Sequence, residues 1–222
     1  MKILAIETST LTGSVALLED EAVLGEITLS VSVQHSERLM PAIEQLLSNA
    51  RVDLSEIDLF AVTVGPGSFT GLRIGIAAVQ GLAMAGHQPI LGVSTLQSLA
   101  YQGIFFPGLI VPCLNAYRGE IYWGLYQKVP GSFWCESVLE DCVTPVAPLL
   151  KELSARGEKA LLLGNGYDTY RDQFNLDGQN IVIAPSPMCY PKASHTAFLA
   201  LQRWQKGERD ELVLPRYFRV PG

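Results

Sequence analysis

AVTVGPGSFTGLRIGIAAVQGLAMA, spanning Ala61–Ala85, is the stretch of this sequence that decides its fold. Ala61–Val64 is a short apolar, β-branched run ending at Gly65-Pro66-Gly67, which predicts a buried strand that closes in a turn. The residues after the turn predict a helix. Ser68 and Thr70 can each offer a side-chain oxygen to the free N–H groups of its first turn.

This helix combines a glycine row with a second apolar face. Gly67, Gly71 and Gly75 recur at a spacing of four residues. An internal glycine costs about 1 kcal/mol relative to alanine, so the row indicates that another backbone or a ligand comes close. The other apolar positions are Leu72, Ile76, Val79 and Ala83. A helix that is apolar nearly all round is buried on more than one side, so we expect one side to need a partner.

Composition and charge narrow the class of protein. With 222 residues, 48% hydrophobic and 17% charged, the chain can bury a core of its own. A net charge of −6 argues against a protein that binds nucleic acid by itself. The four cysteines form no CxxC pair, which favours reduced thiols in the cytoplasm and no metal or disulfide. The apolar runs are too short for a membrane span, and we expect no membrane association.

The order of predicted elements repeats along the chain. Three strands at 2–8, 14–18 and 22–30 precede a helix at 36–50, and three strands at 109–115, 121–127 and 133–139 precede a helix at 145–156. A Gly- and Pro-rich segment from Gly103 to Pro112 separates the halves. We therefore predict an N-terminal lobe over 1–103 and a C-terminal lobe over 104–222, whose last helix is a candidate to pack back on the first lobe.

Two stretches are candidates for holding phosphate. The glycine turn before the second helix is a ready anion site, or else a device for close helix packing; it lacks both GxxxxGK[ST] and GxGxxG with its acidic partner. Glu7-Thr8-Ser9-Thr10 ends the first strand, where a carboxylate and hydroxyls hold Mg-phosphate in some two-lobed kinases, or else form an ordinary turn. The candidate residues are Glu7, Ser9, Gly67, Ser68 and Thr70.

The histidines give little support to metal catalysis. His35, His87 and His195 are far apart, and no HxxxH or HExxH pair places two imidazoles on one helical face. His35 precedes a helix, which favours a solvated or capping role. We found no GxSxG elbow and no cysteine in a recognisable nucleophile setting. We therefore predict neither catalytic residues nor a metal site.

Several longer stretches carry a family resemblance. They are ILAIETST at 3–10, SVALL at 14–18, HSERLMPAIEQLL at 35–47, VGPGSFTGLRIG at 64–75 and NAYRGEIY at 115–122. Together they resemble the TsaB (YeaZ) family of bacterial tRNA threonylcarbamoyladenosine biosynthesis subunits, with the stretch at 64–75 as the most specific signal. The resemblance covers the whole chain and is densest up to Tyr122.

The resemblance implies an α/β fold of the ASKHA (actin-like, hexokinase-like ATPase) class, with two related lobes that each hold a mixed sheet flanked by helices. It also implies a non-catalytic subunit that binds the transferase TsaD, with the ATPase TsaE joining the complex. That complex transfers a threonylcarbamoyl group from threonylcarbamoyl-adenylate to N6 of the adenosine 3′ to the anticodon in tRNAs reading ANN codons. We expect a homodimer when TsaD is missing, only indirect contact with tRNA, and no cofactor of this chain's own, with ATP or ADP and Mg at the level of the complex.

Three departures from related sequences weaken a catalytic role. Glu7 stands where the family often has Asp, and Asn115 stands where an acid is expected. In the catalytic relative a histidine pair on an early helix binds metal, whereas His35 here is followed four residues later by Leu39. The glycine loop is then best explained as a remnant of a nucleotide-binding ancestor.

Our main hypothesis is that the helices at 36–50 and 69–85 form half of a helical bundle with TsaD or with a second copy. The residues expected in this interface are Leu39, Ile43, Leu46, Gly71, Leu72, Gly75, Ile76, Val79 and Ala83. The alternative is an ASKHA-type phosphotransferase or ATPase that holds Mg-nucleotide with Glu7, Ser9, Ser68 and Thr70. A metallopeptidase, suggested by distant resemblance to so-called glycoproteases, fails for lack of ligands.

Overall fold

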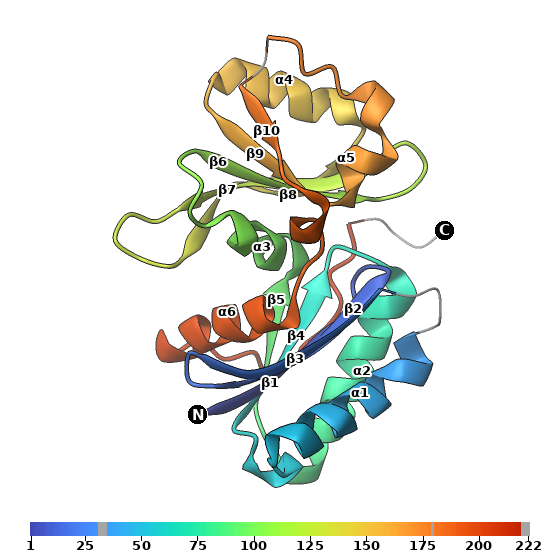
Figure 1. Cartoon of the computed structure of the whole chain (residues 1–222), viewed down its shortest axis with the longest axis vertical. Coiled ribbons are helices and arrows are strands. Elements are labelled where there is room, and N and C mark those ends of the chain that lie inside the picture. Colours follow the sequence, from blue (N-terminus) through green and yellow to red (C-terminus); the bar gives the residue numbers. More distant parts are fainter. Residues whose placement is uncertain (31–34, 179, 219–222) are drawn as a thin grey trace. The chain divides into compact units, whose positions relative to one another are not determined.

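The computed structural model describes residues 1–30, 35–178 and 180–218, apart from the side chain of His35 (Figure 1). The chain divides into two compact units. The first comprises Met1–Ser98 and Pro191–Tyr217, and the second comprises Leu99–Tyr190, which Phe218 joins. The first unit thus ends at Ser98, whereas the sequence suggested residue 103, and the last helix belongs to the first unit.

The first unit is built on a five-stranded mixed sheet in the order β3-β2-β1-β4-β5. Its strands are β1 (Lys2–Glu7), β2 (Thr12–Glu19), β3 (Ala22–Ser30), β4 (Leu59–Gly65) and β5 (Ile90–Ser94). The first three form an antiparallel meander, and β4 and β5 run parallel to β1. The central strand β1, KILAIE, is buried over all but its first residue, whereas the edge strand β3 is largely exposed.

Helices cover both faces of this sheet, as Figure 1 shows. On one face lie α1 (His35–Ala50) and α2 (Phe69–Gly86), and on the other lies α6 (Ala193–Gln205). A short helix, α3 (Thr95–Ala100), follows β5, and a 3₁₀ turn at Leu54–Glu56 precedes β4. Apolar side chains of β1 and β4 pack against α1 and α2 to form the core of the unit, with Phe60 fully buried at its centre.

The second unit repeats this topology. Its strands are β6 (Leu109–Asn115), β7 (Ile121–Lys128), β8 (Cys135–Thr144), β9 (Ala160–Leu163) and β10 (Ile181–Ile183), in the order β10-β9-β6-β7-β8. Its helices are α4 (Val146–Arg156) and α5 (Asn165–Thr169), with 3₁₀ turns at Tyr101–Gly103, Arg171–Gln173 and Ser186–Met188. Again three strands form an antiparallel meander and two run parallel to the first of them. The predicted duplication and two-lobed α/β class are confirmed.

One strand of the repeat differs from the prediction. The sequence placed the third strand of the second unit at 133–139, whereas β8 begins at Cys135 and continues to Thr144. Strand β8 remains paired with β7 as far as its last residue, because Thr144 lies opposite Ile121. Irregularities in this register interrupt the alternation of side chains on which a strand prediction rests.

Candidate partner-binding surface

The glycine loop ahead of α2 closes on the first strand of its own sheet. Ser68 is the N-cap of the helix, and its Oγ accepts a hydrogen bond of 3.2 Å from the N–H of Gly71. The N–H of Ser68 donates to the carbonyl of Ser9 at 2.7 Å. Two donors that could hold an anion at this helix start are therefore bonded within the unit. The predicted capping role of Ser68 is confirmed.

The glycine row of α2 faces β1 and the turn after it, not a partner. A Cβ on Gly71 would lie 2.0 Å from the carbonyl oxygen of Thr8, and a Cβ on Gly75 would lie 2.3 Å from Thr8 Oγ1. A Cβ on Gly67 would lie 2.3 Å from the carbonyl oxygen of Ser9. The Thr8 hydroxyl donates to the Gly71 carbonyl at 2.8 Å, which fixes this close approach. The interpretation of the glycine row as a docking surface is therefore wrong, because intramolecular packing requires it.

The apolar residues assigned to the interface are also buried inside the first unit. They are Leu39, Ile43, Leu46, Leu72, Ile76, Val79 and Ala83, none of them more than 7% exposed. With Gly71 and Gly75 they point at the sheet and leave no surface for another molecule. The sequence showed that α2 is apolar on two sides. The predicted interface residues lie on the side that packs against the sheet of the same unit.

Glu7 is fully buried on the opposite face of β1 from Thr8. Its Oε1 accepts hydrogen bonds from the N–H of Ser9 at 2.6 Å and from Ser9 Oγ at 2.5 Å. Oε2 has no hydrogen-bond partner among the described residues. Burial raises the pKa of this carboxyl from 4.5 to about 6, and the hydroxyls of Ser9 and Thr63 oppose the rise.

The structure joins four of the five phosphate candidates in one closed network. Glu7 holds Ser9, and Ser9 in turn contacts Gly67 and Ser68. Thr70 stands apart, exposed on the first turn of α2. A fully buried carboxyl with occupied neighbouring donors does not present a phosphate cradle. We interpret this network as a structural one, which holds the glycine loop against the residues that follow β1.

The two histidines whose side chains are described, His87 and His195, differ in their surroundings. His87 is an exposed residue that ends α2 in the left-handed conformation, with φ of 59°. His195 is partly buried in α6, and removal from solvent lowers its pKa to about 4. The role predicted for the His35 side chain lies outside the described residues. The part of the chain that the structure describes contains no cluster of His, Cys, Asp or Glu able to hold a metal ion.

The outer side of α2 has an exposed apolar surface around Ala77, Gly81 and Met84, at positions other than those that the sequence predicted. Arg73 is the one charged residue in this 18-residue helix. Ala77 and Gly81 are exposed, Met84 is 78% exposed, and a Cβ on Gly81 would meet nothing within 4 Å. Ile74, Ala78 and Leu82 are partly buried beside them. The sequence signal was present: Ala77, Gly81 and Ala85 repeat the spacing of four in small residues.

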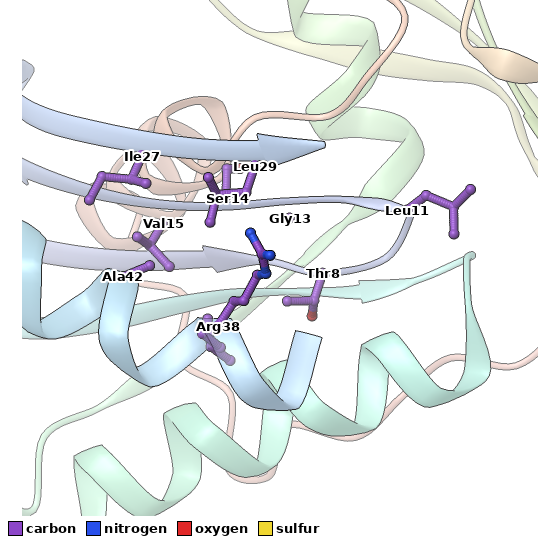
Figure 2. Close-up of a pocket in the computed structure, with 10 residues that line it drawn as sticks. Thr8, Leu11, Gly13, Ser14, Val15, Ile27, Leu29, Arg38 and Ala42 are labelled. Carbon is purple, nitrogen blue, oxygen red and sulfur yellow. The ribbon is translucent and has the colours of Figure 1, made fainter. Parts of the chain in front are cut away.

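Helix α1 extends this surface. It contacts α2 along the same face of the sheet, and Met40, 39% exposed, and Pro41 lie on its outer side. Between α1 and the edge of the sheet lies a small hollow, drawn in Figure 2. Arg38 reaches from α1 across its mouth, and the walls are mainly apolar, from Val15, Ile27, Leu29, Leu39 and Ala42. We call the outer sides of α1 and α2 the α1/α2 face.

The fold first identifies the class of protein. A polyphosphate/ATP-glucomannokinase from Arthrobacter shares it at a TM-score of 0.51 with 7% sequence identity, over 92% of this chain and 99% of that chain. Two mixed sheets of the same topology, each flanked by helices, form the two-lobed ASKHA-type fold.

Closer relatives then identify the family. The Bacillus subtilis tRNA threonylcarbamoyladenosine biosynthesis protein TsaB is 35% identical over 221 residues, 99% of this chain and 95% of the relative. The structure of YeaZ from Pseudomonas aeruginosa matches with a TM-score of 0.84 and 31% identity, over 97% of this chain and 99% of that chain. The model of the family TsaD, tRNA N6-adenosine threonylcarbamoyltransferase, matches residues 23–198. The chain belongs to the TsaB (YeaZ) family, within the wider group that the TsaD model describes.

Proposed function

We propose that this chain is a non-catalytic scaffold in tRNA threonylcarbamoyladenosine biosynthesis and that it binds a TsaD-type transferase through the α1/α2 face. The assembly would transfer a threonylcarbamoyl group to N6 of the adenosine 3′ to the anticodon in tRNAs reading ANN codons. Family membership supports the pathway, because relatives of this length and similarity are named for it. The observation that carries the partner is the apolar outer side of α2.

The exposed side of α2 is well suited to helix packing. Its 18 residues extend over about 27 Å at 1.5 Å per residue, and its outer small residues allow another helix to approach closely. By length and hydropathy α2 is also the one described helix that could cross a membrane. Six of its residues are buried against its own sheet, so lipid could not surround it. A protein partner explains the remaining apolar surface better.

The closed loop supports the scaffold role. Within the first-lobe loop, the N–H groups of Ser68 and Gly71 are bonded inside the unit, to Ser9 O and Ser68 Oγ, and so are not free to bind a nucleotide phosphate. We therefore propose that this chain requires no cofactor of its own and that ATP or ADP with Mg acts at the level of the complex. TsaE would join through that complex, and the same face would form a homodimer when TsaD is absent.

A second candidate function is an ASKHA-type phosphotransferase or ATPase. The buried Oε2 of Glu7, at the end of β1, is the observation in its favour. Calorimetry of the isolated chain with ATP and Mg²⁺ separates the two candidates. The scaffold account expects no saturable heat, and tight binding with turnover would replace it by the enzyme account.

The α1/α2 face is tested by placing a charge on its exposed side. Ala77→Arg introduces a long cation at an exposed position of α2, and Ala155→Arg makes the same change at an exposed position of α4 in the second unit. Ile76 is 4% exposed, so Ile76→Glu would unfold the lobe and test nothing about binding. We expect Ala77→Arg to abolish co-purification with TsaD and Ala155→Arg to leave it unchanged. A folded Ala77→Arg variant that still co-purifies with TsaD would refute the proposed surface.

A further inference from the structure

The second unit carries an exposed cluster of aromatic and basic side chains outside the α1/α2 face. Phe105 is 77% exposed and Phe133 is 56% exposed, and their ring centroids lie 6.2 Å apart at an interplanar angle of 71°. The Nζ of Lys128 lies 5.2 Å from the Phe105 ring centroid and 5.3 Å from that of Phe133. We call these three residues the Phe–Lys cluster. Exposed phenylalanines gathered in this way indicate a contact surface.

Defined backbone elements hold the cluster. Lys128 is the last residue of β7, and Phe133 lies in the turn that joins β7 to β8. Two backbone hydrogen bonds close this turn, from Val129 N to Trp134 O at 2.9 Å and from Ser132 N to Val129 O at 3.2 Å. Figure 1 shows the β7–β8 hairpin extending beyond the rest of its sheet. The Phe133 ring is therefore presented by a hydrogen-bonded hairpin, whereas Phe105 lies in the segment that precedes β6.

A second lysine–phenylalanine pair adjoins the cluster in sequence. Lys159 Nζ lies 5.4 Å from the ring centroid of Phe106, the residue after Phe105. The N–H of Leu109, at the start of β6, donates to the carbonyl of Lys159 at 2.9 Å. This bond ties the end of the segment that carries Phe106 to the residue directly before β9. Among the described residues neither Lys128 nor Lys159 forms an ion pair, so both charges are available to an anionic ligand.

The chemistry of the cluster suits unpaired nucleic acid bases better than another protein. The centres of protein interfaces are depleted in lysine, whereas surfaces for single strands combine aromatic faces, on which bases stack, with cations along the backbone. In a duplex the base faces are already stacked and out of reach. With a net charge of −6, general attraction of phosphate is weak, so stacking must supply most of the affinity.

We propose that the Phe–Lys cluster binds an RNA loop, with Phe105 and Phe133 against unpaired bases and Lys128 and Lys159 near the adjoining phosphates. The assignment of that RNA to the anticodon loop of a tRNA rests on the proposed function. Direct contact of this chain with RNA goes beyond the indirect contact expected from the sequence. The contact is weak in the isolated chain and gains strength when a partner holds the same RNA.

The probe is a fluorescent RNA stem–loop, and a blunt RNA duplex of the same composition is its control. Titration of the isolated chain, followed by anisotropy, should show preference for the stem–loop. Phe133→Ser should weaken stem–loop binding by about 5-fold to 140-fold, since each stacked base contributes about 1–3 kcal/mol. Tyr117→Ser removes an aromatic ring that is 62% exposed at the opposite end of the β6–β7 pair, and it should leave binding unchanged.

Salt dependence tests the lysines separately. Two phosphate contacts predict a slope of about −1.4 for log K against log salt concentration on a single strand, and Lys128→Met should reduce it to about −0.7. Photocrosslinking with 4-thiouridine in the loop should label peptides that contain Phe105 or Phe133. Equal binding of duplex and stem–loop, crosslinks confined to other peptides, or full binding by folded Phe133→Ser would overturn the proposal.

These measurements use the isolated chain and RNA, so their failure leaves the TsaD-binding proposal intact. Conversely, loss of TsaD binding in Ala77→Arg does not affect stem–loop binding by the chain alone. If Phe133→Ser instead abolishes co-purification with TsaD while RNA binding is unchanged, the cluster is a protein contact and the RNA proposal is wrong.

Discussion

Two glycine-to-alanine substitutions in the same helix are predicted to change stability in opposite directions. Gly71 lies against the carbonyl oxygen of Thr8, which a new Cβ would approach to 2.0 Å. Gly81 lies on the outer side of α2, where a new Cβ would meet nothing within 4 Å. Both positions are inside the helix, so the gain in helix propensity is the same at each.

The magnitudes follow from the contacts. Alanine favours the helix over glycine by about 1 kcal/mol, so Gly81→Ala should stabilise the first unit by about that amount. At Gly71 the clash is with backbone, which no side-chain rotation can relieve, and overpacking costs about 1–3 kcal/mol or more. Displacing β1 also weakens the 2.8 Å hydrogen bond from Thr8 to the Gly71 carbonyl, worth about 1 kcal/mol. We expect Gly71→Ala to lose about 2 kcal/mol net.

Hydrogen exchange of peptides from β1 and α2 measures this difference within the first unit. Global unfolding is less suitable, because a chain of two compact units need not unfold in one transition. Protection should fall in Gly71→Ala and rise in Gly81→Ala. Equal effects of the two substitutions, or a stabilising effect of Gly71→Ala, would refute the close packing of the glycine row against β1.

Further predictions concern buried charge. The pKa of Glu7 is raised from 4.5 to about 6, so its contribution to stability is full below pH 4.5 and is lost as pH rises through 6. Between these pH values Glu7→Gln should therefore gain about 2 kcal/mol of stability relative to wild type, measured by hydrogen exchange of β1 peptides. The pKa of His195 is lowered from 6.5 to about 4. As pH rises from 4 to 6.5, the free energy of unfolding of the wild type should therefore increase by about 3 kcal/mol more than that of His195→Gln. A pH-independent difference from wild type in either variant would contradict these assignments. Asp210 accepts from Gly92 N at 2.8 Å and from Arg203 at 3.0 Å, so Asp210→Ala should cost about 1–3 kcal/mol and increase hydrogen exchange at Gly92, and unchanged exchange there would argue against this contact.

The order of strands and helices in both units could be predicted from the sequence, whereas the strand order within each sheet came from the structure. Apolar runs, glycine turns and helical periodicity placed the strands and helices, and the repeated order of elements indicated two related lobes. Ser68 was recognisable as a cap because a serine directly before a helix can accept a hydrogen bond from the free N–H groups of the first turn. These features depend on neighbours in the chain, which a sequence displays directly.

The exposed face that we propose for partner binding was harder to predict, because it depends on how α2 is rotated about its axis. The helix has small and apolar residues on both sides, and the row of Gly71 and Gly75 is more conspicuous than the row of Ala77 and Gly81. The sequence does not reveal that Thr8 lies against the glycine row. Likewise Phe105 and Phe133 are distant in sequence, and only the sheet and hairpin bring them together.

The most direct test of the proposed scaffold role is hydrogen exchange of this chain with and without TsaD. Our account predicts that complex formation slows exchange in peptides covering Arg73–Ala85 and Met40–Ser48, which carry the exposed sides of α2 and α1. Peptides of α4 should exchange at the same rate in both samples. Formation of a stable complex with no change in α1 and α2, and with protection confined to the second unit, would contradict it.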